Sequence, residues 1–119
     1  MTMRDGFYHV RFSTGNGSTA TGEGLVILKG ETVQGGDFGM LYQGTMSAQG
    51  VEGDSGQVGG ALQIKRYQPG PSSVFGPLNE FQLALRGRFG PGNFRLSGTT
   101  EKAPGLTITI EGRHVGDAI

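Results

Sequence analysis

Polar and apolar residues alternate along most of the chain, with a period of two. The segment GLTITIEGRHV shows the pattern plainly, since Ile108 and Ile110 fall on one face while Thr107, Thr109 and Glu111 fall on the other. Strict alternation over several residues is typical of a β-strand with one buried face. The same pattern predicts inward-facing sets at Tyr8, Val10 and Phe12, at Leu62 and Ile64, at Phe81, Leu83 and Leu85, at Phe94 and Leu96, and at Leu106, Ile108 and Ile110.

One stretch departs from this alternation. In GEGLVILKG the residues from Leu25 to Leu28 are apolar on both faces. Such a run is expected of a strand that is covered on both sides.

Turn-forming residues separate these runs at short intervals. Gly30-Glu31 is short enough for a two-residue hairpin loop between strands at 22–29 and 32–35. We find no 3.6-residue apolar repeat with a helix cap, and the spacing indicates about eight short antiparallel strands. The sequence therefore predicts an all-β protein: a single domain over residues 1–119, folded as a small up-and-down β-barrel, since closure removes exposed strand edges.

Glycine is unusually abundant, with 24 residues in a chain of 119. Within a strand, glycine marks a bulge, a barrel corner or a close approach of backbones, or faces inward and leaves space for a cavity. Strong curvature around a small interior is the favoured explanation for the glycines expected inside strands, which are Gly22, Gly24, Gly44, Gly59, Gly60, Gly87, Gly98 and Gly112.

The segment GGDFGMLYQG, residues 35–44, has the glycine density of a phosphate-binding loop. It lacks the Gly-Lys-Ser/Thr ending of a P-loop, however, and no helical pattern follows to supply a positive N-terminus. We predict instead that Gly35-Gly36-Asp37 form a turn in which the carboxylate of Asp37 accepts hydrogen bonds from nearby amides.

Charge and cysteine content narrow the function classes. Ten basic and ten acidic side chains cancel, and the basic residues are scattered in the sequence, so we expect no direct nucleic-acid binding. The absence of cysteine removes disulfides, thiolate nucleophiles and most zinc sites. Because no segment approaches the ~20 apolar residues of a membrane span, and no signal-peptide pattern opens the chain, we expect a cytoplasmic protein without membrane contact.

Catalytic patterns are weak. His9 and His114 lie far apart in the sequence, and no serine sits in a Gly-x-Ser-x-Gly elbow. Two distant histidines among scattered carboxylates also provide no metal-ligand cluster. We therefore predict no catalytic residue, metal or cofactor; an enzyme remains the third alternative, and it would require His9, His114, Asp37 and a tyrosine to converge in one cleft.

Two loops are candidates for contact with other molecules. Glu52 and Asp54 lie in the glycine-rich polar stretch SAQGVEGDSGQ, which is either a solvated hairpin loop or a docking site for a basic partner. Val74 and Phe75 lie in a proline-punctuated connection, where they either plug one end of the barrel or form an exposed patch.

The N-terminal segment MRDGFYHVRFS, together with GEGLVILKGETVQGGDFGMLYQGTM, resembles the first half of the GrlR family of negative regulators of type III secretion. The shared residues are Asp5, Gly6, Tyr8, Phe12, Gly22, Gly24, Gly30, Gly36, Asp37, Tyr42 and Gly44, and the second half matches only loosely. The resemblance implies a lipocalin-like eight-stranded barrel that forms a homodimer and acts by holding a transcriptional activator. The best-known member uses a compact Glu-Asp-Glu-Asp motif for its partner, whereas only Glu52 and Asp54 are acidic here, so the contact surface is expected to differ.

An alternative function is the binding of a small apolar ligand, since barrels of this family carry a cavity able to take a lipid-like molecule. Binding pockets of this kind are mostly apolar with few polar groups. The candidate cavity residues are Tyr8, Val10, Phe12, Tyr42, Leu83, Phe94 and Ile108.

Overall fold

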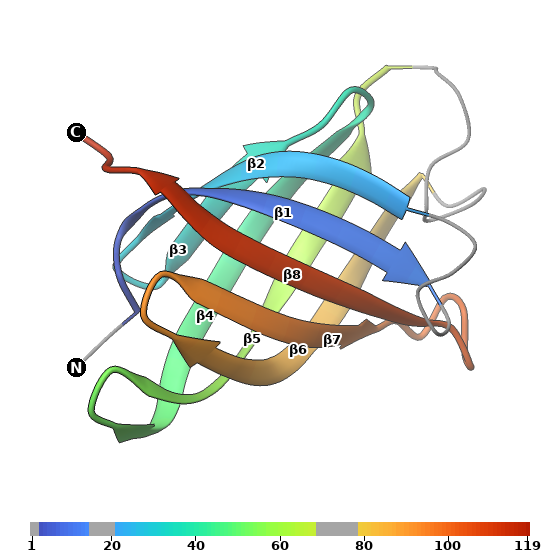
Figure 1. Ribbon diagram of the computed structural model, residues 1–119. Helices are drawn as coiled ribbons and strands as arrows, with labels where there is room; N and C mark the ends of the chain where they lie inside the picture. The colour runs from blue at the N-terminus through green and yellow to red at the C-terminus, as the bar shows by residue number, and fades with distance from the viewer. Residues whose placement is uncertain (1–2, 15–20, 69–78) are drawn as a thin grey trace.

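The computed structural model describes residues 3–14, 21–68 and 79–119 of the chain. Eight antiparallel strands follow one another in sequence order, and β1 pairs with β8 to close a barrel (Figure 1). The strands are β1 (Gly6–Thr14), β2 (Thr21–Lys29), β3 (Thr32–Gly36), β4 (Met40–Glu52), β5 (Ser55–Arg66), β6 (Glu80–Gly90), β7 (Asn93–Thr99) and β8 (Thr107–Gly116). The predicted all-β, eight-stranded up-and-down barrel is thereby confirmed.

The predicted hairpin at Gly30-Glu31 is also confirmed. Lys29 pairs with Thr32 across the two-residue loop, and Gly30 adopts a φ of 63°, in the left-handed region that favours glycine. The Asp5 carboxylate accepts a hydrogen bond of 2.9 Å from the Gly30 amide. This bond attaches the chain just before β1 to the β2–β3 turn.

The core is the inside of the barrel, and the period-two pattern correctly predicts which side chains fill it. Alternate residues of the strands are buried, as in β1 and β6, where Tyr8, Val10 and Phe12 and then Phe81, Leu83 and Leu85 point inward. Burial of each large apolar side chain stabilises the fold by about 1.5–3 kcal/mol. One continuous apolar cluster runs through all eight strands.

Several inward glycines lie where neighbouring strands approach too closely for any side chain. A Cβ atom on Gly44 would lie 2.0 Å from the carbonyl oxygen of Ala61, and one on Gly60 would lie 2.0 Å from that of Thr45. Gly87 has a similar contact, at 2.1 Å, with the carbonyl oxygen of Arg95. These glycines permit the tight coiling of β4 to β7, which agrees with the curvature expected from the sequence.

The prediction that the strand containing Leu25–Leu28 is covered on both sides is wrong for this chain. Val26 and Leu28 are buried inside the barrel, but Leu25 and Ile27 point outward and remain 47% and 37% exposed. A single closed sheet has one buried face, so the outer face of β2 has nothing in the described structure to cover it.

The ends of the barrel differ in shape. The β4–β5 hairpin, green in Figure 1, extends beyond the β6–β7 turn at one end.

The described segments contain no helix long and apolar enough to cross a membrane. Val74 and Phe75 lie outside the described residues.

Candidate functional site

The β3–β4 turn is organised by the carboxylate of Asp37. Its Oδ1 atom accepts hydrogen bonds of 2.9 Å from the amides of Gly39 and Met40. The Asp37 amide in turn donates to the carbonyl oxygen of Met40, at 3.0 Å. The predicted role of this carboxylate in binding nearby amides is confirmed, but Gly35 and Gly36 were wrongly placed in the turn: they end β3, the turn begins at Asp37, and β4 begins at Met40.

Side chains from outside the turn fix it further. The Tyr42 hydroxyl, inside the barrel, donates to Oδ2 of Asp37. The Tyr67 hydroxyl donates to the Asp37 carbonyl oxygen at 2.7 Å, and the Gln68 amide nitrogen donates to the Phe38 carbonyl oxygen at 2.6 Å. The turn is thus held by side chains from β4 and from the residues that follow β5.

This well-held turn presents an apolar side chain to solvent. Phe38 is 89% exposed, although the residues on either side of it are fixed by hydrogen bonds. Phenylalanine on a rigid turn loses little conformational freedom on binding, which is the property of a preorganised contact residue.

The pKa of the Tyr42 hydroxyl is raised by burial and by the Asp37 carboxylate of the same turn, which lies beside it. Burial is the main cause that raises the pKa of its hydroxyl above the ordinary value of 10.0, and the hydrogen bond and charge of Asp37 raise it further. The hydroxyl therefore stays protonated and remains a donor to Asp37 through the neutral and mildly alkaline range.

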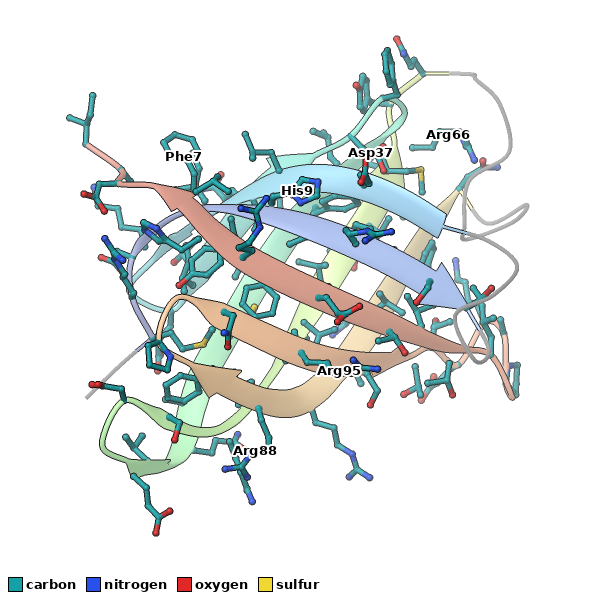
Figure 2. All side chains as sticks on the ribbon, in the orientation of Figure 1. Phe7, His9, Asp37, Arg66, Arg88 and Arg95 are labelled. Carbon is teal, nitrogen blue, oxygen red and sulfur yellow. The ribbon has the colours of Figure 1, made fainter. Side chains whose placement is uncertain are left out.

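The outer face of β1, β2 and β4 carries further apolar side chains, exposed on β2 and β4 and half-buried at Phe7 of β1. Phe7 pairs with Ile27 across β1 and β2, while Leu25 and the 44% exposed Leu41 flank Gly36 on either side of β3. Gly36 has no side chain to stand between the two leucines, and a Cβ atom there would lie 3.7 Å from the Leu41 side chain. We call Phe7, Leu25, Ile27, Leu41 and Phe38 the apolar face; Phe7 is labelled in Figure 2.

The seven candidate cavity residues are brought together inside the barrel. Tyr8, Val10, Phe12, Tyr42, Leu83, Phe94 and Ile108 are all buried members of the core cluster. Aromatic rings pack closely among them, with ring centroids 5.2 Å apart for Tyr8 and Phe94 and for Phe12 and Tyr42.

Two inward glycines leave less space than the sequence suggests. A Cβ atom on Gly112 would lie 2.2 Å from the Phe94 ring, and one on Gly24 would lie 3.1 Å from the Tyr42 ring. Both positions are therefore covered by aromatic rings, the Gly112 position from the neighbouring strand β7 and the Gly24 position from β4 across the interior. An apolar ligand at either position would have to displace a ring.

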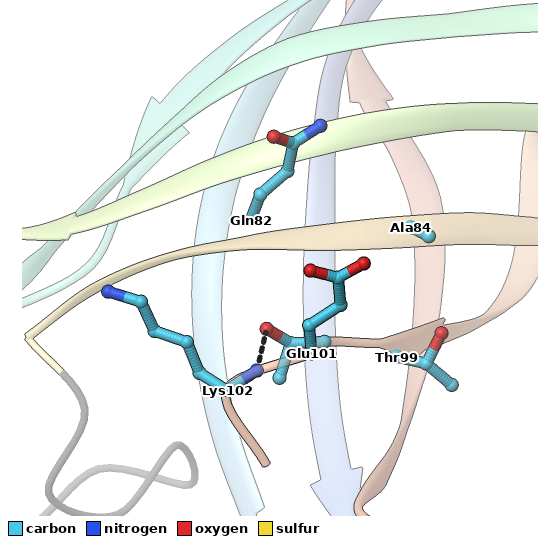
Figure 3. A pocket seen from close by; sticks show the side chains of 6 residues that line it. Gln82, Ala84, Thr99, Glu101 and Lys102 are labelled. Atoms are coloured by element: carbon cyan, nitrogen blue, oxygen red, sulfur yellow. Dashed lines mark hydrogen bonds between the residues drawn. The ribbon is translucent and has the colours of Figure 1, made fainter. Parts of the chain in front are cut away.

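Two pockets lie on the outside of the barrel. One, of about 600 Å³, is lined by Gln82 and Ala84 of β6, by Thr99 at the end of β7 and by residues 100–102 after it (Figure 3). The Lys102 amide donates to Thr100 Oγ1 at 3.3 Å, and its ammonium group donates to the Glu80 carbonyl oxygen at 2.8 Å. Of the two charged residues that line this pocket, Lys102 is bonded to the protein and Glu101 is exposed to solvent. A second pocket, of about 710 Å³, lies over the outer surface of β1 and β6–β8.

The residues that an enzyme would have to bring together are distributed over three places. His9 points outward, with Nε2 3.6 Å from the Glu23 carboxylate. His114 points inward at the barrel end, where Nε2 lies 3.1 Å from the Asp5 carbonyl oxygen and the ring packs edge-on against Tyr8. Asp37 lies in the β3–β4 turn. Within the described segments, no three His, Asp or Glu side chains form a group that could hold a metal ion.

Glu52 and Asp54, the candidate contact residues, occupy the tip of the β4–β5 hairpin. Residues 49–54 are all exposed, and the turn is closed by a bond of 3.3 Å from the Ser55 hydroxyl to the Glu52 carbonyl oxygen. The two carboxylates are free to meet a partner in solution. Sequence reasoning did not identify Phe38, Leu25, Ile27 or Leu41 as exposed contact residues. The apolar run at 25–28 indicates a strand, but it does not show that the outer face of that strand is uncovered.

No family model matches the chain, and no curated protein is significantly similar to it in sequence.

Proposed function

We propose that this protein is a non-enzymatic, cytoplasmic regulatory protein that acts by direct contact with a transcriptional activator. The likeness of residues 5–44 to the GrlR family motivates the choice of partner. The observation that carries the proposal is the apolar face, since large apolar side chains gathered on one surface of a soluble barrel mark an interaction site.

The apolar face has the features of a protein contact. Phe38 is a preorganised aromatic anchor in the turn, and the exposed Leu25, Ile27 and Leu41 point outward from the strands on either side of β3. Burial of apolar side chains of this size on association supplies roughly 25 cal/mol per Å² of area removed from water. Homodimer formation, which the resemblance implies, is part of the same proposal.

Affinity purification from cells that naturally express the protein tests this function. Tagged wild-type protein is expected to retrieve a DNA-binding activator, and the purified activator should bind the barrel directly and lose promoter activation in its presence. The Leu25→Ser/Ile27→Ser variant should lose most of this binding. Gln57→Ser/Gln63→Ser changes two exposed outward residues of β5 and should retain it. Repeated recovery of the barrel with no activator would refute the proposal.

The alternative function, binding of a lipid-like ligand in the barrel, is supported by the burial of all seven candidate residues in one interior. Native mass spectrometry of protein purified without detergent tests it. A retained apolar molecule that is lost in a Leu83→Glu variant supports the alternative. A bare mass under conditions that preserve known lipid complexes counts against it.

A further inference from the structure

The fold gathers basic residues that are scattered in the sequence onto one outer surface of the barrel. Arg86 and Arg88 of β6, Arg95 of β7, Arg113 of β8 and Arg11 of β1 all point outward from four neighbouring strands. We call these five side chains the arginine face; Arg88 and Arg95 are labelled in Figure 2. They are five of the ten basic residues in the chain.

A single cross-strand row forms the centre of this face. Arg88 pairs with Arg95, which pairs with Glu111, which pairs with Arg11, which pairs with Glu23. Arg95 lies 3.2 Å from Glu111, and Arg11 lies 3.8 Å from Glu23. Five arginines against two glutamates leave a surplus of three positive charges on this surface.

The three surplus positive charges can be assigned to arginines that lack an ion-pair partner among the described residues. Among the described residues, none of the ion pairs involves Arg86, Arg88 or Arg113. Arg88 and Arg95 are directly opposite each other, and like charges in this position destabilise a sheet. An anion between the two guanidinium groups would relieve that repulsion.

The same surface is hollowed. This open pocket of about 710 Å³ is lined by His9, Arg11, Arg88, Arg95, Arg113 and Glu111, together with residues of the β6–β7 turn. Guanidinium groups bind carboxylates through two parallel hydrogen bonds, so several of them around one depression form a surface for an anionic chain.

We propose that the arginine face binds an extended, acidic peptide segment of another protein. Arg86 and Arg88 are two residues apart on β6, which places them about 6.7 Å apart along the strand. Alternate side chains of an extended segment have the same spacing, so carboxylates at every second residue would lie over successive arginines.

The face suits a peptide better than a nucleic acid. Glu111 and Glu23 stand within the central row, so a continuous phosphate backbone crossing the row would pass close to their carboxylates, whereas a short peptide running along β6 avoids both. Binding of single strands also uses exposed aromatic rings for base stacking. Among the described residues that line this hollow the outward ring is His9, whereas Phe89 and Phe94 are buried.

This inference stands apart from the proposed function, because it concerns charged side chains and not the apolar face, although the two surfaces adjoin where His9 pairs with Leu25. Its test uses purified protein and no activator. A fluorescein-labelled peptide of alternating glutamate and serine is titrated with the protein at low and at near-physiological salt, and binding is followed by fluorescence anisotropy.

Wild-type protein is expected to bind the peptide and to lose about tenfold in affinity as salt is raised. Arg88→Ala/Arg95→Ala should lose about tenfold at low salt. Lys29→Ala/Lys65→Ala removes the same charge elsewhere and should bind like the wild type. Thermal unfolding provides a second readout: Arg88→Ala should be at least as stable as the wild type, since it removes a like-charge pair.

Three outcomes would overturn the inference. The wild type could fail to bind the peptide at low salt, or the lysine variant could lose as much affinity as the arginine variant. Alternatively, a DNA or RNA oligonucleotide could bind more tightly than the peptide and lose that affinity in the arginine variant, which would identify a nucleic-acid surface instead.

Discussion

The hydroxyl of Tyr42, inside the barrel, donates a hydrogen bond to the carboxylate of Asp37 in the β3–β4 turn. This contact links the core to the loop that holds Phe38 in solvent. The glycines of GGDFGMLYQG accordingly serve the backbone of a tight turn and its flanking strands. The anion they accommodate is the protein's own Asp37 carboxylate.

Replacement of Tyr42 by phenylalanine should test how much this link stabilises the fold. The ring remains in the core while the bond to a charged acceptor is lost, so we expect a loss of about 1.5–3 kcal/mol in unfolding free energy. Urea denaturation followed by far-UV circular dichroism measures it. Tyr67→Phe removes a bond from an exposed hydroxyl to the Asp37 carbonyl oxygen and should cost about 0.5–1.5 kcal/mol. Equal losses in the two variants would contradict a special role for the buried bond.

The same tyrosine predicts how stability changes at alkaline pH. The pKa of Tyr42 is raised in the folded protein, chiefly by burial, whereas the unfolded chain titrates near pH 10. Above about pH 10 the unfolded state therefore binds fewer protons than the folded state, and the unfolding free energy falls as pH rises, by up to about 1.4 kcal/mol per pH unit. Below that pH this contribution is fully present.

Urea denaturation at a series of pH values from neutral to about pH 11 measures the alkaline slope. Lysines and the other tyrosines also titrate in this range, so the informative quantity is the difference between wild type and Tyr42→Phe. The variant should show a shallower decline. A slope identical in both proteins would mean that Tyr42 does not control the alkaline limit.

Packing of the Phe94 ring over Gly112 predicts a severe effect from one added methyl group. Gly112→Ala places a Cβ atom about where the ring lies, so we expect a loss of about 1–3 kcal/mol from overpacking. Gly39→Ala is the matched control, because its Cβ would have ordinary contacts, the nearest at 3.6 Å from Arg66. In the double variant Gly112→Ala/Phe94→Leu the smaller side chain should restore part of the stability lost in Gly112→Ala, relative to Phe94→Leu alone. Denaturant midpoints of the four variants would show whether the two positions are coupled.

The sequence was sufficient to predict the barrel and its interior because one rule governs both. Ile108 and Ile110 must face the same way in any strand, and a closed sheet has one inside, so alternation alone identifies the buried residues. The Asp37 turn was also predictable, since an aspartate after two glycines has few ways to satisfy its carboxylate other than by nearby amides.

The outer surfaces could not be predicted in the same way. Arg88 and Arg95 become neighbours only through the register of β6 with β7, which depends on the length of the turn between them and is invisible to a period-two pattern. The exposure of Leu25 and Ile27 depends on the absence of a second layer over β2, which no local feature of GLVILKG reveals. Alternation shows that a residue points outward, but the strand register decides which outward residues become neighbours. Their grouping is therefore visible only in the folded structure.

Substitution of Phe38 should separate an effect on activator binding from an effect on the stability of the fold. Its side chain is almost fully exposed, so Phe38→Ser should change the unfolding free energy by no more than about 0.5 kcal/mol. If the apolar face contacts the activator, the same change removes an aromatic anchor and should weaken binding by about 2 kcal/mol, which is roughly thirtyfold in Kd. Isothermal titration calorimetry with the purified activator measures the affinity, and thermal unfolding measures stability. Ile119→Ser also removes an exposed apolar side chain, but at the C-terminus, and should leave the affinity unchanged. Unchanged affinity in Phe38→Ser would exclude the β3–β4 turn from the contact, while equal losses in both variants would indicate a nonspecific apolar effect.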